Sequence, residues 1–406
     1  MLVLWRVTLT PSARGGRVVE GTGRTRRELD VRTTRRREGD ATMALNARPA
    51  GARTRGTGGP TLAVVGATGA VGAVLIDLLS TRRDVYGEIR LVASPRSAGR
   101  ALPLRGADVE VAPLAPEVFD GVDIAMFGVP DAVAARWVPV ATGRGAVAVD
   151  NSGAFRMAPD VPLVVPEVNP ERVRRRPRGI VASPSCTTLS MIMVIGALHR
   201  RYGLRELVVS SYQAASGVGL EGVDTLYEQM EKVGGDRALG NRAGDLRCAV
   251  GEFGPFPAPL AMNVVPWAGE VRDGGWSSEE LKIREESRKV LGLRDLRVTA
   301  TCVRVPVVTA HSLSVHAVFE DRVDQREAQA VLAGSPGVVL CDNPETQEFP
   351  TPADVVGTDP AWVGRVRRSL DDPKALDLFL CGDNLRNGAA LNTAQIAELV
   401  AAELTP

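Results

Sequence analysis

Hydrophobic residues first recur with the spacing of regular structure at about residue 61. The segment 61–82 begins with the apolar run LAVV, continues through a glycine-rich turn, and then has the period of an amphipathic helix. Short apolar runs follow near 88–93, 123–128 and 145–150, with turn residues and helical stretches between them. Strands that alternate with helices predict an α/β fold with a Rossmann-type, doubly wound parallel sheet.

The pattern changes after about residue 186. Longer runs in which apolar and polar residues alternate lie at 204–217, 293–308 and 311–320. They predict a mixed or antiparallel sheet with helices on one face. The C-terminal run 384–404 has apolar positions at helical spacing and predicts one helix.

These patterns divide the chain into three parts. We expect residues 60–185 and 384–406 to form the Rossmann domain, with the C-terminal helix returning to it. Residues 186–383 would form a second, α+β domain, and residues 1–59 would precede both.

Residues 1–59 have no sustained apolar period and differ in charge from the rest. They contain 13 Arg and 5 acidic residues, a net charge of +8, whereas the whole 406-residue chain carries only +1. We predict a basic, disordered extension, because a run of charge is usually a solvated tail. Three alternatives are a basic arm that touches nucleic acid, a transit-like peptide, and translation that begins at Met43.

The composition narrows the classes of function. The near-neutral total charge gives no reason to expect a nucleic-acid partner, and 4% aromatic residues leave little for stacking against bases. The five Cys form no CxxC pair, so we expect neither a metal site nor a disulfide framework, and the pattern fits a reducing cytoplasm. The longest apolar run, near 189–198, is too short to span a bilayer, so no membrane association is expected.

The turn after the first strand has the spacing of a nucleotide-binding loop. Its glycines lie three positions apart, and such glycines let the backbone approach a pyrophosphate closely. The N-terminus of the following helix would offer free N–H groups and a positive dipole end to the phosphates. The predicted cofactor-binding residues of this loop are Gly66, Thr68, Gly69, Ala70, Val71 and Gly72.

The end of the second strand indicates which nucleotide binds. An NAD site usually has an acidic residue here, which binds the ribose hydroxyls. This chain has Ser94, Arg96 and Ser97 instead, a set suited to a 2′-phosphate. We therefore expect NADP as the cofactor.

Cys186 is the strongest candidate nucleophile. Pro184 and Ser185 end the preceding segment, and the apolar run after Cys186 predicts a buried helix that ends at Gly203. A helix N-terminus favours the thiolate over the thiol. A thiolate beside a nicotinamide would form a thioester or thiohemiacetal with a carbonyl substrate.

Such chemistry needs an acid or base, and the chain has three histidines. His311 follows a turn and starts a strand, which is a common place for a functional side chain. His199 at the polar end of a helix has the setting of a surface residue, and His316 in mid-strand that of a structural one. His311 is therefore the predicted acid/base.

The motifs together resemble the aspartate-semialdehyde dehydrogenase family. Between about 61 and 404, its order is followed by GATGAVG, SAGR, DNSGAFRM, PLVVPEVN, SYQAASG, EELKIREESRKVLG, TCVRVPV, AHS and NLRNGAALN. The resemblance implies reversible, NADP-dependent reductive dephosphorylation of L-4-aspartyl phosphate to L-aspartate 4-semialdehyde, in lysine, methionine and threonine biosynthesis. It also implies a homodimer formed through the second domain, which would carry catalysis.

The resemblance assigns roles to single residues. It implies Cys186 as the nucleophile, Gln213 as the residue that positions the thioester or substrate, and His311 as the acid/base. The implied substrate-binding residues are Glu279 for the amino group, Arg156 and Lys282 for phosphate, and Arg304 for the carboxylate. Further cofactor contacts are implied for Ser216, Gly217 and Asn384.

Local spacing gives independent support for a helix that carries two of these residues. Ser277 and Glu280 have the spacing of a capping box, so a helix should begin there. Glu279, Lys282 and Glu286 would then share one face of that helix.

Three departures from the family pattern affect the expected site. Ser185 replaces an Asn before the nucleophile, Gly128-Val129-Pro130 replaces a small Ser-Ala-Gly turn, and Ala310 replaces the Gly before His311. They suggest a divergent paralogue. The alternatives are therefore a related acyl-phosphate reductase, such as N-acetyl-glutamyl-phosphate reductase, and a non-catalytic NADP-binding protein.

Overall fold

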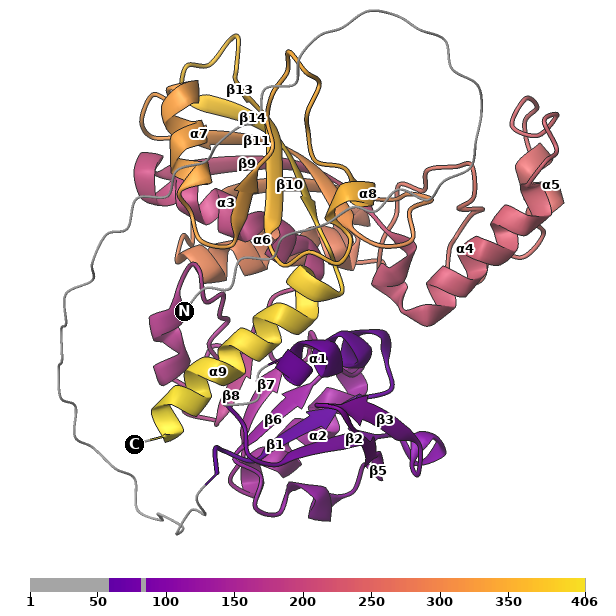
Figure 1. Ribbon diagram of the computed structural model, residues 1–406. Helices are drawn as coiled ribbons and strands as arrows, with labels where there is room; N and C mark the ends of the chain where they lie inside the picture. Colours follow the sequence, from indigo (N-terminus) through magenta and orange to yellow (C-terminus); the bar gives the residue numbers. More distant parts are fainter. Residues whose placement is uncertain (1–57, 82–84, 406) are drawn as a thin grey trace, which may run out of the picture. The chain divides into compact units, whose positions relative to one another are not determined.

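A computed structural model describes residues 58–81 and 85–405, so most of the predicted extension 1–59 lies outside the described residues. Within the described part, the first of two six-stranded sheets is parallel, with the order β5-β2-β1-β6-β7-β8 (Figure 1). Its strands are β1 (Leu62–Val65), β2 (Ile89–Ala93), β5 (Ala112–Pro113), β6 (Ile124–Phe127), β7 (Val147–Asp150) and β8 (Ile180–Ala182).

The strands of this sheet are apolar because both of its faces are covered. Alternate residues of β1 point into two separate apolar layers. One layer contains α1 (Ala70–Thr81) and α9 (Asn392–Leu404), and the other contains α2 (Asp131–Gly143). A strand that is buried on both sides cannot alternate with polar residues, which explains the continuous runs in the sequence.

The second sheet is mixed and has the order β10-β9-β11-β14-β13-β12. Its strands are β9 (Leu204–Gln213), β10 (Arg297–Arg304), β11 (His311–Phe319), β12 (Val338–Leu340), β13 (Ala361–Arg368) and β14 (Ala375–Gly382). Three helices pack on one face of this sheet, namely α3 (Cys186–Tyr202), α6 (Ser278–Leu291) and α7 (Gln325–Ala333). The fold class predicted from the sequence is therefore confirmed.

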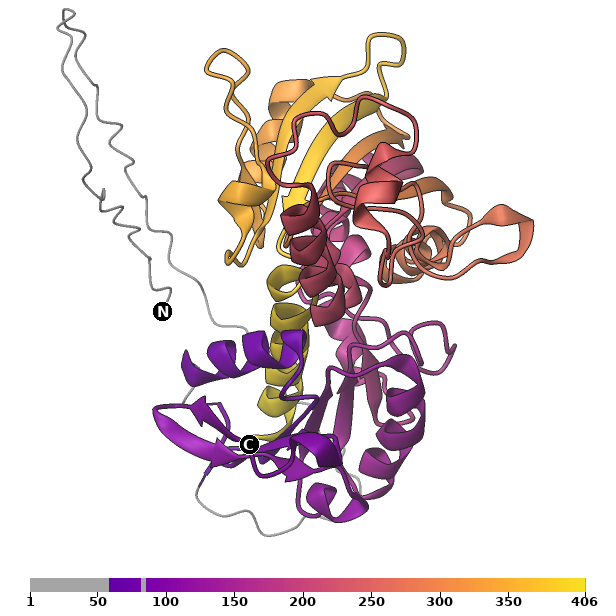
Figure 2. The same ribbon diagram turned by 90° about the vertical axis from the view of Figure 1, so that its right-hand side faces the viewer.

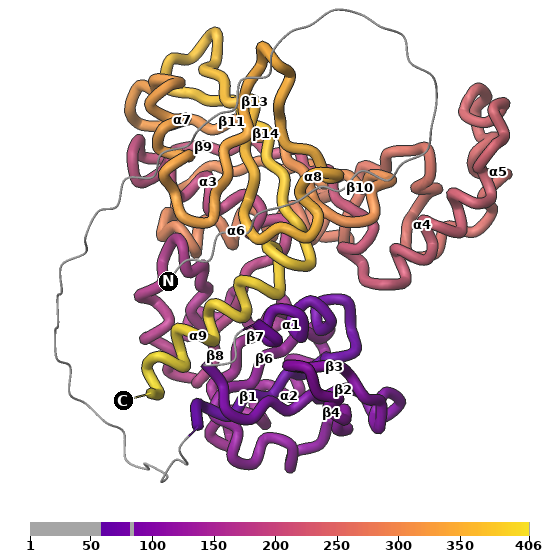
Figure 3. Tube along the Cα trace, in the orientation of Figure 1, coloured from indigo at the N-terminus to yellow at the C-terminus, as the bar shows by residue number. Residues whose placement is uncertain are grey.

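Between β9 and α6 the chain makes an excursion away from the second sheet, which can be followed along the trace (Figure 3). This excursion contains α4 (Leu220–Val233) and α5 (Asp245–Val250) and has a small apolar core that includes Leu226 and Phe256. The remaining short elements are β3 (Ala101–Leu104), β4 (Ala107–Glu110), α8 (Pro352–Val355), η1 (Pro95–Ser97), η2 (Pro116–Phe119), η3 (Pro170–Arg174), η4 (Ala215–Val218) and η5 (Asp273–Gly275).

The C-terminal segment connects the two sheets. After β14 it forms η6 (Arg386–Leu391), a π-helical turn, and then α9, which runs back along the parallel sheet (Figures 1 and 2). The return to the Rossmann domain agrees with the prediction, but the single helix expected over 384–404 is wrong at its start. This π-helical turn is wider than a turn of α-helix, and it brings the backbone at Gly388 close to Cys186.

No helix in 58–81 or 85–405 combines the length and the apolar character that a membrane crossing requires. The predicted domain boundaries stay predictions. The parallel sheet ends at Ala182 and α3 begins at Cys186, four residues later.

Candidate active site

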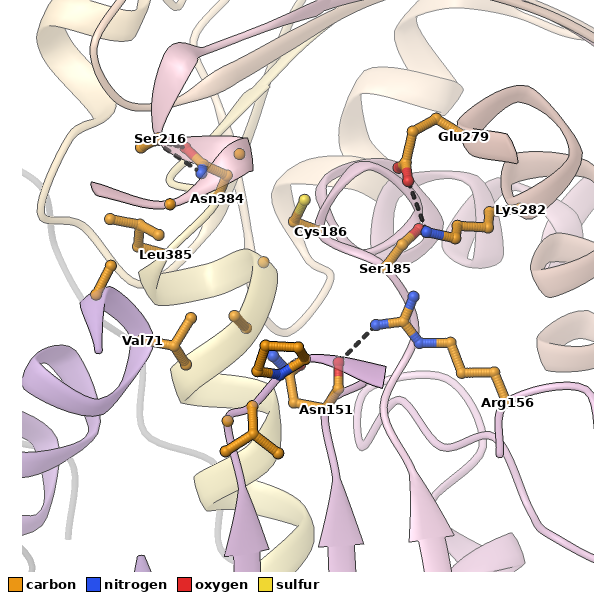
Figure 4. Close-up of a pocket in the computed structure, with 18 residues that line it drawn as sticks. Val71, Asn151, Arg156, Ser185, Cys186, Ser216, Glu279, Lys282, Asn384 and Leu385 are labelled. Carbon is orange, nitrogen blue, oxygen red and sulfur yellow. Dashed lines mark hydrogen bonds and ion pairs between the residues drawn. The ribbon is translucent and has the colours of Figure 1, made fainter. Parts of the chain in front are cut away.

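A cavity of about 360 Å³ lies where the carboxyl ends of the parallel strands meet the start of α3. Its lining comes from both halves of the described chain. The lining residues are Ala70, Val71, Gly128, Val129, Pro130, Asn151, Arg156, Ser185, Cys186, Ser216, Gly217, Gly219, Glu279, Lys282, Asn384, Leu385, Gly388 and Ala389. Figure 4 shows Cys186 between the Ser216–Asn384 pair on one side and the charged residues of α6 on the other.

The glycine-rich loop borders this cavity at the N-terminus of α1. Gly66 has φ +93, a left-handed conformation that side chains other than glycine rarely adopt. A Cβ on Gly72 would collide with the carbonyl oxygen of Gly66, so the loop stays tight only with glycine at both positions. Ala70 and Val71, the first two residues of α1, line the cavity, so the N-terminus of α1 borders it.

The three residues expected at a nucleotide 2′-phosphate lie outside the lining of this cavity. Ser94 follows β2 directly, and Arg96 and Ser97 belong to the short turn η1. Arg96 is exposed, and within the described residues its side chain makes no hydrogen bond or ion pair. It is available to an anion at the end of β2.

Cys186 and His311 meet although 125 positions separate them. The Cys186 Sγ lies 3.2 Å from His311 Nε2, and the backbone N–H of Ala214 donates to His311 Nδ1 at 3.1 Å. Cys186 is the first residue of α3, as predicted, and His311 is the first residue of β11 and fully buried. The other two histidines lie elsewhere: His316 pairs with Asp377, and His199 is half-buried, with its Nδ1 accepting from the Leu204 N–H.

The electrostatic setting of this pair differs from the one expected at a helix N-terminus. Burial raises the pKa of the Cys186 thiol, and the Glu279 carboxylate raises it further, while Arg304, Arg156 and Lys282 lower it. Burial and the Arg304 charge hold the pKa of His311 well below its usual range. Burial therefore opposes the thiolate that the helix N-terminus is expected to favour at Cys186.

Ser185 caps α3 and joins it to α6. Its Oγ accepts from the Thr188 N–H at 3.4 Å, and both its N–H and its Oγ–H donate to Glu286 Oε2 at 2.8 Å. The other oxygen of Glu286 accepts from Arg156 Nη1 at 3.1 Å. Glu286 is 1% exposed, and the hydrogen bonds from Ser185 and Arg156 compensate the buried negative charge of its carboxylate.

Two charged residues of α6, Glu279 and Lys282, line the cavity, in agreement with their predicted position on one helix face. The capping box of Ser277 and Glu280 is present, and α6 begins at Ser278. Lys282 Nζ lies 2.6 Å from Glu279 Oε1. Burial lowers the pKa of Lys282, but Glu279 more than offsets this, so the pKa is raised and the ammonium is retained.

Arg156 enters the same cavity from the loop after β7. Its Nε donates to the Ser183 carbonyl at 2.8 Å and its Nη2 to the Asn151 carbonyl at 2.6 Å. With Glu286 on Nη1, these contacts hold the guanidinium beside Lys282, although they also satisfy part of its hydrogen-bonding capacity.

Arg304 and Gln213 lie behind Cys186 at the ends of neighbouring strands. Arg304 is buried, and its Nη1 donates to the Ala214 carbonyl at 2.9 Å. Burial lowers the pKa of Arg304, and Cys186 and Glu279 partly restore it. Gln213 is also buried, and its Nε2 donates to Ser211 Oγ at 3.2 Å. Neither its side chain nor that of Arg304 lines the cavity.

The last three predicted cofactor residues form one wall of the cavity. Asn384 Nδ2 donates to Ser216 Oγ at 2.9 Å, and Asn384 Oδ1 accepts from the Ala310 N–H at 2.9 Å. Gly217 lies so close to Arg304 that a Cβ there would collide with the guanidinium.

Four features of the site were missed by the sequence reasoning. These are the Glu286 contacts, the Asn151 carbonyl, the Ala214 N–H and the close approach of Gly388. Only Glu286 had a signal, since it shares a helix face with Glu279 and Lys282. The Asn151 carbonyl and the Ala214 N–H are backbone atoms, which leave no mark on residue type, and the glycine at 388 does not by itself show what it packs against.

The fold and two matching family models define a semialdehyde dehydrogenase with a nucleotide-binding domain. The family model described as semialdehyde dehydrogenase, NAD binding domain, matches residues 61–176, and the model described as semialdehyde dehydrogenase, dimerisation domain, matches residues 195–387. The aspartate-semialdehyde dehydrogenase of Corynebacterium melassecola is 45% identical over 347 residues, which cover 84% of this chain and 99% of that protein.

Solved structures agree with this similarity. A crystal structure of aspartate semialdehyde dehydrogenase II from Vibrio cholerae, complexed with ASA, is 33% identical with a TM-score of 0.78, covering 86% of this chain and 99% of that one. The Candida albicans aspartate semialdehyde dehydrogenase with NADP has the same fold, at 23% identity and a TM-score of 0.63, covering 85% and 99% of the two chains. The chain belongs to the aspartate-semialdehyde dehydrogenase family.

Proposed function

We propose that this chain catalyses the reversible NADP-dependent reductive dephosphorylation of L-4-aspartyl phosphate to L-aspartate 4-semialdehyde through a thioester on Cys186. The observation that carries the proposal is the 3.2 Å contact between His311 Nε2 and the Sγ of Cys186, which lines a cavity that Arg156, Lys282 and the N-terminus of α1 also border. Membership of the family and the intact set of Cys186, Gln213 and His311 support an active enzyme over a non-catalytic paralogue.

The residues around the cavity fit a dinucleotide. Gly66, Thr68, Gly69, Ala70, Val71 and Gly72 would hold the pyrophosphate at the N-terminus of α1. Arg96, with Ser94 and Ser97, would select NADP by binding the 2′-phosphate. When bound, the nicotinamide supplies the hydride that reduces the thioester, or accepts it in the reverse direction.

Cys186 would form and release the covalent intermediate. In the reductive direction its thiolate attacks the acyl carbon, the C–S bond forms, and phosphate leaves with the electrons of the C–O bond. After reduction, the C–S bond breaks, the aldehyde leaves and the thiolate is regenerated. His311 is the proposed acid/base of this cycle, and Gln213, which now contacts Ser211, would turn to position the thioester.

The ionic residues match the charges of the substrate. Arg304 would bind the carboxylate in a bidentate manner, because its guanidinium is buried and planar. Glu279 would bind the amino group, and Arg156 and Lys282 would bind the phosphate. Ser216, Gly217 and Asn384 would contact the nicotinamide end of the cofactor from the opposite wall.

We also propose that the enzyme is a cytoplasmic homodimer. All five thiols, each within the described residues, are free, as expected in a reducing compartment. Val208 and Tyr212 of β9 are 42% and 37% exposed on the face of the second sheet opposite α3. A second copy packed on this face would cover them.

A steady-state assay tests the proposal. The full-length protein should reduce NADP⁺ with L-aspartate 4-semialdehyde only when phosphate is present, and Cys186→Ala should abolish turnover while NADP binding changes by no more than about threefold.

Arg96→Ala should weaken NADP binding by about 1–3 kcal/mol and leave NAD binding nearly unchanged. Activity that prefers N-acetyl-glutamate semialdehyde, or that survives in Cys186→Ala, would contradict the proposal.

A further inference from the structure

Glu286 is a buried carboxylate that the proposed function leaves without a role, and it contacts both the phosphate-binding arginine and the residue before the nucleophile. We propose that Glu286 is a positioning residue, which orients Arg156 toward the phosphate and fixes this arginine relative to Cys186 for the transfer of the acyl group between sulfur and phosphate. The inference rests on the proposed function and adds a residue to its phosphate site.

The first step is that Glu286 uses both of its carboxylate oxygens. Oε2 accepts from the N–H and from the Oγ–H of Ser185, each at 2.8 Å, and Oε1 accepts from Arg156 Nη1 at 3.1 Å. Ser185 directly precedes Cys186. A glutamine has only one acceptor oxygen, so it could not serve both partners.

The second step is that Glu286 completes the fixation of Arg156. The guanidinium also donates from Nε to the Ser183 carbonyl and from Nη2 to the Asn151 carbonyl. Within the described residues these contacts use three of its five N–H groups, which leaves one on each terminal nitrogen. A phosphate can accept from these two groups in a bidentate manner, in an orientation that the other three contacts set.

The third step is the place of Glu286 beside the two phosphate-binding cations. Arg156 and Lys282 line both the main cavity and a neighbouring cavity of about 250 Å³, whereas Glu286 lines only the neighbouring one of these two. The carboxylate therefore reaches Arg156 without lining the cavity of Cys186. It acts on the reaction through Arg156 and not by contact with the acyl group.

The charges around Glu286 favour an intact cationic pair. Burial lowers the pKa of Lys282 and Glu279 raises it more, while Arg156 lowers it and Glu286 raises it to a smaller extent. The Glu286 carboxylate thus offsets part of the repulsion between Arg156 and Lys282. Two cations can then share one phosphate at a partly buried site.

The step that depends on this arrangement is the attack of phosphate. In the oxidative direction, an oxygen of the hydrogen phosphate dianion attacks the thioester carbon, the C–O bond forms, and the C–S bond breaks with its electrons left on Cys186 as thiolate. The oxygen held by Arg156 must meet the carbon held by Cys186, so the relative position of the two residues sets the rate. Hydride transfer comes before this step and does not need phosphate.

Steady-state kinetics of the full-length protein in the oxidative direction tests the inference with Glu286→Gln. The amide oxygen should stay with Ser185, which offers two donors, and the amide N–H₂ would then oppose the guanidinium of Arg156. We expect the KM for phosphate to rise about tenfold, and the KM values for L-aspartate 4-semialdehyde and NADP⁺ to change by less than about twofold. An unchanged KM for phosphate would overturn the proposal.

Glu285→Gln is the matched control. Glu285 lines the same neighbouring cavity, but it pairs with two arginines of its own helix and not with Arg156. Its substitution should leave all three KM values unchanged. Glu286→Asp, which keeps the charge but is too short to reach both partners, should raise the KM for phosphate in the same direction, and it replaces Glu286→Gln if that variant does not fold.

A double-mutant cycle separates positioning from a general structural role. In an Arg156→Ala background, Glu286→Gln should change kcat/KM for phosphate by less than about twofold, because the residue through which Glu286 acts is gone. A loss as large as in the wild-type background would show that Glu286 acts independently of Arg156 and would overturn the inference.

Equilibrium dialysis with radiolabelled inorganic phosphate keeps this test apart from the proposed function, since it needs no turnover. A wild-type protein without phosphate-dependent activity would contradict the proposed function alone. Weaker phosphate binding by Glu286→Gln than by Glu285→Gln would still support the positioning role, and equal binding by the two variants would refute it.

Discussion

At the scale of single residues, Ser185 determines how the start of α3 is held. Its hydroxyl caps the helix and also donates to Glu286, so it has little freedom to reach a substrate oxygen. An asparagine, which the family pattern has at this position, can cap a helix equally well and places a longer amide donor at the same edge of the cavity. Ser185 is thus a position where the residue type limits the donors available to the reaction.

We predict that Ser185→Asn raises kcat for L-aspartate 4-semialdehyde by about threefold to tenfold, with KM changed less. The reason is that a donor that reaches the reacting oxygen acts mainly in the transition state. Steady-state kinetics measures both constants, and Ser185→Ala, which lacks any donor, is the control. A kcat that falls or stays flat would favour a paralogue retuned to another acyl phosphate.

At the scale of elements, the π-helical turn η6 packs against the first turn of α3. A Cβ on Gly388 would lie 2.9 Å from the Cys186 Cβ and 3.1 Å from its Cα. Real Cβ atoms essentially never come closer than 3.0 Å, so one of the two elements would have to shift. The C-terminal segment, which lies about 200 residues away along the sequence, therefore constrains the position of Cys186.

We predict that Gly388→Ala lowers kcat about tenfold to a hundredfold and destabilises the fold by about 1–3 kcal/mol. Displacement of Cys186 from His311 is the cause of the kinetic loss. Kinetics and chemical denaturation measure the two effects. The matched control is Gly143→Ala at the end of α2, where nothing lies within 4 Å and both quantities should change little. Unchanged kcat in Gly388→Ala would refute this role for η6.

At the scale of the whole molecule, the second sheet has two unlike faces. The helices α3, α6 and α7 cover one face, while Val208, Tyr212 and Ser314 are exposed on the other. Tyr212 and Phe379 have ring centroids 6.3 Å apart across the small residues of β11, which makes part of this face apolar. A stable dimer needs a surface with an apolar centre, and Val208, Tyr212 and Phe379 contribute apolar side chains to this face.

We predict that Val208→Glu converts the proposed dimer to a monomer, because a second copy packed on this face would bury the new carboxylate without a partner. Light scattering coupled to size-exclusion chromatography measures the mass. Leu370→Glu, at a fully exposed residue of the turn between β13 and β14, should leave the mass unchanged. Retention of the dimer in Val208→Glu would place the interface elsewhere.

The sequence by itself determined the local features of this protein. The glycine loop before α1, the capping box of α6 and the position of Cys186 at a helix start each depend on residues fewer than ten positions apart. The continuous apolar runs of the first sheet and the alternating runs of the second sheet depend only on which side chains are buried away from water. For the same reason the fold class and the candidate nucleophile could be predicted before any contact was known.

Only the tertiary structure decided which of these residues contact each other and in what electrostatic surroundings they lie. His311 lies 125 positions from Cys186, and Glu286 lies 101 positions from Ser185, so no local pattern could pair them. Burial, which no sequence window measures, raises the pKa of the Cys186 thiol and so opposes the effect expected from a helix N-terminus. Every residue except proline carries a backbone N–H, and only folding brings that of Ala214 to the Nδ1 of His311.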